Sequence, residues 1–133
     1  MASRSLDDLR PEFRVNVDAW LDACLAASLS ILVYCTMRSS AEQDELYTHG
    51  RTAPGPIVTN AKGGFSAHNF GLALDFVPLL NGKPQWAGGN GLYTLAINLA
   101  SARGMQSLAH SSFPEWAHLQ APDWQNIANT TLI

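Results

Sequence analysis

The segment SAHNFGLALD, Ser66 to Asp75, constrains the fold of this chain most strongly, because it holds His68 and Asp75 seven residues apart. On a straight helix such side chains lie roughly 10 Å apart along the axis. On a straight strand they point to opposite faces and lie more than about 20 Å apart. The two side chains can meet only if the chain bends between them, and Gly71 bends most easily because it has no Cβ. The alternative is a loop histidine followed by a strand aspartate that faces solvent.

The first half of the chain predicts two helices and a strand. Apolar residues recur with helical spacing from Leu9 to about Ser28 and predict a core-packing helix. Residues 31–36, ILVYCT, are β-branched and aromatic, as in a buried strand. Ser39 and Glu42 form a capping box that opens a helix over residues 41–49. Residues 51–64 are rich in glycine and proline and predict a long surface loop of a length that is more often functional than idle.

The second half predicts strands joined by a hairpin, and a further long helix. The run LALDFV, residues 72–77, is expected to be a strand, and Asn81-Gly82 is typical of a hairpin turn. Residues from about Asn90 to Arg103 carry an apolar stripe and predict a helix that ends at Gly104. Short pieces, MQSLAH and EWAHLQ, and a terminal segment PDWQNIANTTLI follow. We therefore expect a small α+β domain over residues 1–133, with helices packed on a short, mainly antiparallel sheet.

Composition excludes several classes of function. The 133 residues are 47% hydrophobic and 14% charged with a net charge of -3, so bulk charge does not favour a nucleic-acid partner. No segment approaches the roughly 20 apolar residues of a membrane span, and the N-terminal segment lacks the apolar core of a secretory signal. We expect a chain made in the cytoplasm without a signal peptide, with no membrane partner. Cys24 and Cys35 stand in apolar surroundings and are expected to be buried, reduced packing residues.

The segment PEWAHLQ supplies a second pair of candidate site residues. Glu115 and His118 are three residues apart, which lets them converge on a helical turn or a bent segment. A catalytic zinc takes three histidine or carboxylate ligands and keeps a fourth position open, and His68, Asp75 and His118 supply that set. Glu115 is then free to act as the base and acid that peptide hydrolysis requires. The alternative is a solvated Glu-x-x-His pair on a protein surface.

Two further histidines compete for the metal. His49 ends a predicted helix before a glycine, where a partner of the helix dipole is the simpler role. His110 lies eight residues before His118 and is a candidate contact for the substrate or for a metal ligand.

These motifs resemble those of the zinc peptidases that cleave bacterial cell-wall peptides, the D-alanyl-D-alanine carboxypeptidases and dipeptidases. The family signature Ser-x-His-x-x-Gly-x-Ala-x-Asp is met in full within residues 66–75. The resemblance implies Glu115 as catalytic base and His118 as third zinc ligand. Residues 36–76 are similar to the phage endolysin branch of L-alanyl-D-glutamate peptidases, in which an arginine lies by the metal.

The same resemblance implies roles for three more residues. The arginine by the metal corresponds to Arg38, and a fixed guanidinium there can stabilise the oxyanion of a tetrahedral intermediate. Gln43 and Ser66 are implied as neighbours that hold substrate, although Ser66 is equally suited to a turn. The chain departs from the branch at His49, which often is glutamine, and at residues 107–109, Ser-Leu-Ala, where the branch has Trp-Gly-Gly and where a cleft wall is expected.

The sequence thus predicts a zinc-dependent, monomeric endolysin that cleaves the L-alanyl-D-glutamate bond of the peptidoglycan stem peptide. It is expected to act on the cell wall in the periplasm after release from the cytoplasm. One alternative is a D-alanyl-D-alanine carboxypeptidase. Another is a non-catalytic, zinc-containing module that binds the cell wall, for which retention of Glu115 would serve no purpose.

Overall fold

A computed structural model describes residues 2–88 and 91–130 of the chain. Two short 3-10 helices, η1 (Leu6–Asp8) and η2 (Ala67–Phe70), accompany four α-helices and five strands. The α-helices are α1 (Pro11–Ala26), α2 (Ser40–Thr48), α3 (Gly91–Ser101) and α4 (Trp124–Thr130). The strands are β1 (Ser30–Cys35), β2 (Ala73–Leu80), β3 (Lys83–Pro84), β4 (Gln106–Leu108) and β5 (Glu115–Gln120).

The predicted elements are present, with ends that differ from the predictions by a few residues. The capping box is formed, since Ser39 Oγ accepts from the Glu42 N–H and the Glu42 carboxylate accepts from the Ser39 N–H. The hairpin at Asn81-Gly82 joins β2 to the short β3. The predicted first residue of the third helix, Asn90, and residues 131–133 of the terminal segment lie outside the described part of the chain.

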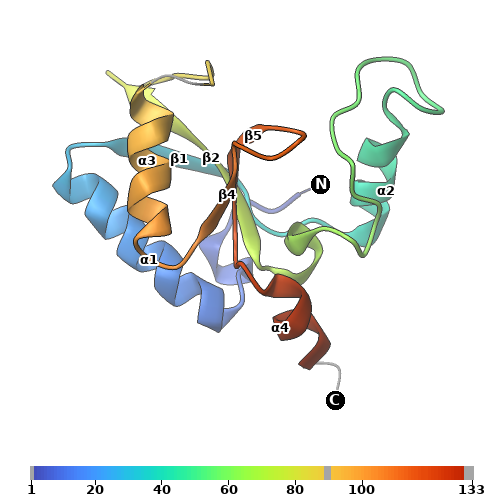
Figure 1. The fold of residues 1–133 in the computed structure, drawn as a ribbon, viewed down its shortest axis with the longest axis horizontal. Helices are drawn as coiled ribbons and strands as arrows, with labels where there is room; N and C mark the ends of the chain where they lie inside the picture. The colour runs from blue at the N-terminus through green and yellow to red at the C-terminus, as the bar shows by residue number, and fades with distance from the viewer. Residues whose placement is uncertain (1, 89–90, 131–133) are drawn as a thin grey trace.

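The strands form one antiparallel sheet in the order β1-β2-β5-β4, with β3 paired to the far end of β2. Helices α1 and α3 lie together against one face of this sheet, whereas α2 and the loop that follows it stand on the opposite side (Figure 1). The predicted α+β class with a mainly antiparallel sheet is therefore confirmed.

The core lies between the sheet and the pair α1 and α3. Trp20 is fully buried there, its indole N–H donates to the Ala96 carbonyl at 2.9 Å, and its ring packs edge-on against Phe76. Burying such aromatic rings stabilises the fold by roughly 2–3 kcal/mol each. Because side chains alternate along a strand, Leu74 and Phe76 enter this core and Asp75 between them faces the other side of the sheet.

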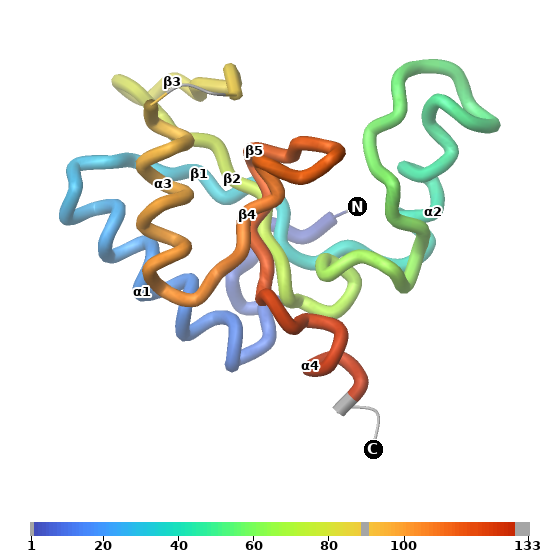
Figure 2. Tube along the Cα trace, viewed as in Figure 1, coloured from blue at the N-terminus to red at the C-terminus, as the bar shows by residue number. Residues whose placement is uncertain are grey.

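The second face of the sheet is left to α2, η2, α4 and the loop over residues 51–64. The chain trace shows this loop rising beside α2 and returning to η2, which leads directly into β2 (Figure 2). Within the described residues, no helix is both long and apolar enough to cross a bilayer. Because η2 and the loop over residues 51–64 lie on the second face of the sheet, the polar side chains at the ends of β1, β2 and β5 meet there.

Candidate active site

His68 is held by the short helix η2 and by the side chains that cap it. Ser66 Oγ accepts from the His68 N–H at 3.3 Å, and the Asn69 side chain accepts from the Ser66 N–H at 3.2 Å. The Asn69 amide also donates to the Arg38 carbonyl at 2.9 Å, which ties η2 to the chain after β1. Ser66 thus has the turn role that the sequence left open, and it is buried in that position.

Gly71 turns the chain from η2 into β2 and brings Asp75 to His68. Its φ is +69°, and a Cβ at this position would lie 2.8 Å from the Asp8 carbonyl oxygen. Beyond the turn, His68 Nε2 lies 3.2 Å from Asp75 Oδ1. The predicted bend at Gly71 is therefore confirmed, and the alternative of a solvent-facing aspartate is wrong, because the Asp75 side chain is only 17% exposed.

His118 reaches the same carboxylate from the neighbouring strand. It is paired with Asp75 across β2 and β5, and its Nδ1 lies 3.5 Å from Asp75 Oδ1. The rings of His68 and His118 are edge to face with centroids 5.0 Å apart. Asp75 is therefore central to a cluster that η2, β2 and β5 assemble.

Glu115 and His118 lie on strand β5, so the helical turn expected as one geometry for this pair is not formed. Residues three apart on a regular strand face opposite sides. The register between β4 and β5 shifts here, since Ser107 pairs with Leu119 but Leu108 pairs with Glu115. The irregular register bends the strand, as in the alternative of a bent segment. Glu115 and His118 can therefore face the same side, and both line one cavity.

The Glu115 carboxyl is half-buried at that cavity. Burial raises its pKa above the ordinary value, and the Asp75 carboxylate adds to the effect against the opposing charge of His118. Within residues 2–88 and 91–130, no side chain forms a hydrogen bond or ion pair with this carboxyl. Glu115 is therefore available to exchange a proton with a molecule in the cavity.

The protonation of His68 tests whether a metal fits the cluster. Its Nδ1 lies 2.9 Å from the Thr36 carbonyl and donates to it, and its Nε2 faces the Asp75 carboxylate and donates to it when no cation lies between them. Burial lowers the pKa of His68, but the Asp75 carboxylate outweighs it and raises the pKa to about 10. Burial likewise opposes the ionised Asp75, yet His68 lowers its pKa. A cation could instead lie between the imidazoles of His68 and His118 and the Asp75 carboxylate. Imidazole nitrogen and carboxylate oxygen are ligand types that zinc prefers.

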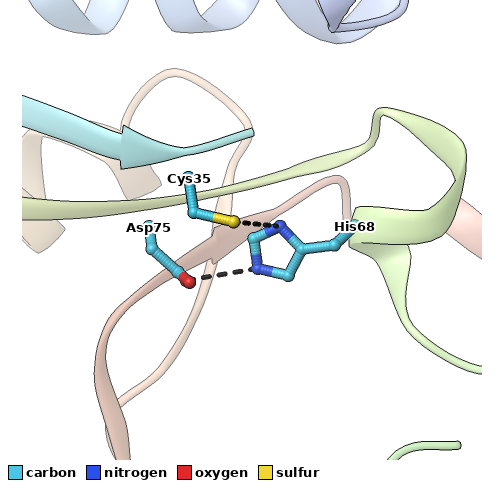
Figure 3. A group of neighbouring side chains, drawn as sticks. All are labelled: Cys35, His68 and Asp75. Carbon is cyan, nitrogen blue, oxygen red and sulfur yellow. Dashed lines mark hydrogen bonds and ion pairs between the residues drawn. The ribbon is translucent and has the colours of Figure 1, made fainter. Parts of the chain in front are cut away.

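Cys35 is a site residue that sequence reasoning missed. It is buried and free, as predicted, but its thiol faces the cluster and not the core (Figure 3). Its Sγ lies 3.9 Å from His68 Nδ1, and donor atoms of Cys35, His68 and Asp75 lie within 4.8 Å of one another. These three residues form a second candidate donor set. Cys24, by contrast, is buried in the core as predicted.

Arg38 borders the cluster in a fixed orientation. Its Nη1 donates to Gln43 Oε1 at 2.8 Å, its Nη2 donates to Cys35 Sγ at 3.3 Å, and Nη2 lies 3.6 Å from Asp75 Oδ2. The Gln43 amide in turn donates to Thr59 Oγ1 and to the Ala61 carbonyl. Both ends of the Gln43 amide are thus engaged, and this residue links Arg38 to the long loop.

The predicted site residues line one cavity of about 300 Å³. All seven line it, namely Arg38, Gln43, Ser66, His68, Asp75, Glu115 and His118. Leu108, from the segment where a cleft wall was expected, lines it as well. His110 does not line this cavity; it is exposed, and its ring packs on Trp116. His49 caps the end of α2 and lines a neighbouring cavity.

Comparison with known proteins decides the family. The model of the VanY D-alanyl-D-alanine carboxypeptidase family matches residues 7–114. The chain belongs to this family. The match stops just before Glu115 and His118, so these two residues are placed at the site by the structure alone.

Individual relatives point to the same group. Over 69 residues the chain is 48% identical to the peptidoglycan L-alanyl-D-glutamate endopeptidase CwlK of Bacillus subtilis (strain 168), a match that covers 52% of this chain and 41% of that protein. Among solved structures, the L-Ala D-Glu endopeptidase ChiX of Serratia marcescens has a TM-score of 0.71 at 18% identity, covering 96% of this chain and 92% of ChiX. VanYB in complex with D-alanine-D-alanine has a TM-score of 0.64 at 16% identity, covering 92% and 78%. The structural likenesses confirm the fold.

Proposed function

We propose that this chain is a zinc-dependent peptidase that cleaves the L-alanyl-D-glutamate bond of peptidoglycan stem peptides. The observation that carries the proposal is the position of Glu115. It lines the same cavity as His68, Asp75 and His118, yet it stands apart from the contacts that join those three. A carboxyl that has no hydrogen-bond partner in the described part of the chain and lies beside a candidate metal centre is suited to act as a catalytic base, and a pure binding module has no use for such a base.

The chain's own residues divide the chemistry between them. His68, Asp75 and His118 would hold zinc, which when bound activates a water molecule and polarises the scissile carbonyl. Glu115 would take the proton of the attacking water and return it to the leaving amine. The Arg38 guanidinium, fixed by Gln43 and Cys35, would donate to the oxyanion as it forms, an effect commonly of a few kcal/mol.

The surroundings of the cavity favour an endopeptidase. A carboxypeptidase must bind a free terminal carboxylate, whereas an endopeptidase must accept chain on both sides of the scissile bond. Two further cavities adjoin the catalytic cavity: one shares Arg38, Leu46 and Asp75 with it, and another shares Phe65 and Trp124. The identity with CwlK over about half of the chain supports the same bond.

Digestion of purified muropeptides tests the proposal. We expect new peptides that begin with D-glutamate, with L-alanine left on the muramyl side, as identified by mass spectrometry. Release of free D-alanine would overturn this bond assignment in favour of a D-alanyl-D-alanine carboxypeptidase. Unchanged muropeptides in the presence of added zinc would favour a non-catalytic wall-binding module.

The resemblance of residues 36–76 to phage endolysins supports a biological role in lysis. We propose that the chain acts as a monomer on the wall in the periplasm after release from the cytoplasm, without a nucleic-acid or membrane partner. Expression directed to the periplasm of a bacterial host should then lyse the cells, and the Glu115→Gln variant should not. Lysis by that variant would contradict the role.

A further inference from the structure

A groove beside the catalytic cavity has a chemical character of its own. It has a volume of about 370 Å³ and shares Phe65 and Trp124 with the catalytic cavity. Its remaining wall includes Phe70, Gln125 and Asn129, and none of its lining side chains is charged. The catalytic cavity and the other cavity that adjoins it, which shares Arg38 and Asp75, are both lined by ionisable side chains. The groove therefore suits an uncharged ligand that offers both apolar faces and hydrogen-bonding groups.

The aromatic side chains form one wall of this groove. The rings of Phe70 and Trp124 are stacked with centroids 5.8 Å apart, which fixes the indole at the junction with the catalytic cavity. Phe65 lies at the same junction and is 70% exposed. Phe65 therefore contributes little to folding, and its ring is open to a molecule in the groove.

The amide side chains form the other wall. Gln125 and Asn129 are four residues apart on α4, so they lie one turn apart on one face of the helix. Both side chains are exposed and line the groove. Amides that border aromatic rings can hydrogen-bond hydroxyl and acetamido groups while the rings cover the apolar face of a sugar ring.

We propose that this groove binds the N-acetylhexosamine unit to which the stem peptide is attached. The inference rests on the proposed function, because L-alanine is the first residue of the stem. Only that residue and its lactyl link separate the scissile bond from the sugar, so the sugar must lie in a cavity directly beside the catalytic one. The groove that contains Phe65 and Trp124 meets this requirement. The ionisable cavity beyond Arg38 and Asp75 would take the charged remainder of the peptide.

The test compares two substrates, a disaccharide-linked stem peptide and the same peptide without sugar. We expect the chain to cleave the linked peptide with the higher kcat/KM. The replacements Phe65→Ala and Gln125→Ala should each reduce the ratio of the two kcat/KM values by at least about fivefold, the usual effect of truncating an important contact residue. The matched control Gln85→Ala removes a partly buried side-chain amide on the hairpin side of the molecule and should leave the ratio unchanged. Equal ratios in all variants would overturn the inference.

A binding measurement separates this inference from the proposed activity. Titration of the peptide-free disaccharide of N-acetylglucosamine and N-acetylmuramic acid, with its lactyl carboxylate converted to the uncharged amide, into the Glu115→Gln variant should produce saturable heat, and adding Gln125→Ala should weaken it. Binding without any peptidase activity in the parent chain would support the groove and reject the proposed function. Cleavage of the free peptide with no binding of the disaccharide would support the function and reject the groove.

Discussion

At the scale of single residues, Glu115 is half-buried with a raised pKa, which suits the proposed role as catalytic base. The replacement Glu115→Gln keeps the shape of the side chain but removes the base, so we expect activity to fall at least ~100-fold. Zinc content and melting temperature should stay near those of the parent chain. Glu12→Gln, a change at an exposed position of α1, is the matched control and should keep full activity. An active Glu115→Gln variant would mean that another group is the base.

Two donor sets share His68 and Asp75, and single replacements separate them. If His118 is the third ligand, His118→Ala should lose most of the bound zinc, while Cys35→Ser should retain it. The position of the Cys35 thiol supports this expectation. The thiol lies beside His68 Nδ1, and that nitrogen is already hydrogen-bonded to the Thr36 carbonyl. Elemental analysis of the purified variants provides the measurement. Loss of zinc from Cys35→Ser alone would instead assign the metal to the set with the thiol.

At the scale of elements, the turn between η2 and β2 determines whether the proposed ligands His68 and Asp75 meet. Gly71→Ala would place a Cβ against the Asp8 carbonyl at a φ that L residues rarely adopt. We expect a loss of more than ~1 kcal/mol in the free energy of unfolding, together with weaker zinc binding. Gly82→Ala is the control, since its φ is +76° but its surroundings are open. Denaturant unfolding and zinc titration check both variants, and equal losses in the two would contradict a special role for the Gly71 contact.

The element α2 acts through a single buried amide. Gln43 is 1% exposed and joins the Arg38 guanidinium to the loop at Thr59 and Ala61. The sequence motif implied a substrate neighbour at this position, and the structure adds a positioning role. The capping box fixes the start of α2, and α2 carries Gln43, so both contribute to the position of Arg38.

At the scale of the whole molecule, two of the proposed ligands come from the consecutive elements η2 and β2, and the third comes from β5, which lies far from them in the sequence. A metal that binds only the folded chain stabilises it, by about 4 kcal/mol at a thousandfold excess over Kd. Removing zinc with a chelator should thus lower the melting temperature by several degrees, and adding zinc should restore it. Scanning calorimetry provides the measurement. The His68→Ala variant is the control and should show no response to either treatment.

Much of the fold and part of the site were predicted from local patterns. The apolar stripes of α1 and α3, the capping box at Ser39 and the turn at Asn81-Gly82 each depend on residues within a few positions of one another. The bend at Gly71 belongs to the same class, because a seven-residue separation leaves few ways for His68 and Asp75 to meet. Local geometry and steric limits determine such features, so the sequence by itself determined them.

The tertiary structure decided what depends on strand pairing. Only the register of β1, β2 and β5 places Cys35 and His118 on either side of Asp75, and only the irregular register of β4 and β5 brings Glu115 to the face of His118. The Thr36 carbonyl that fixes the His68 tautomer is a backbone group and carries no signal in the sequence. The helical geometry considered for Glu115 and His118 was wrong for the same reason. Cross-strand neighbours are set by hydrogen bonding between distant segments, which local spacing does not encode.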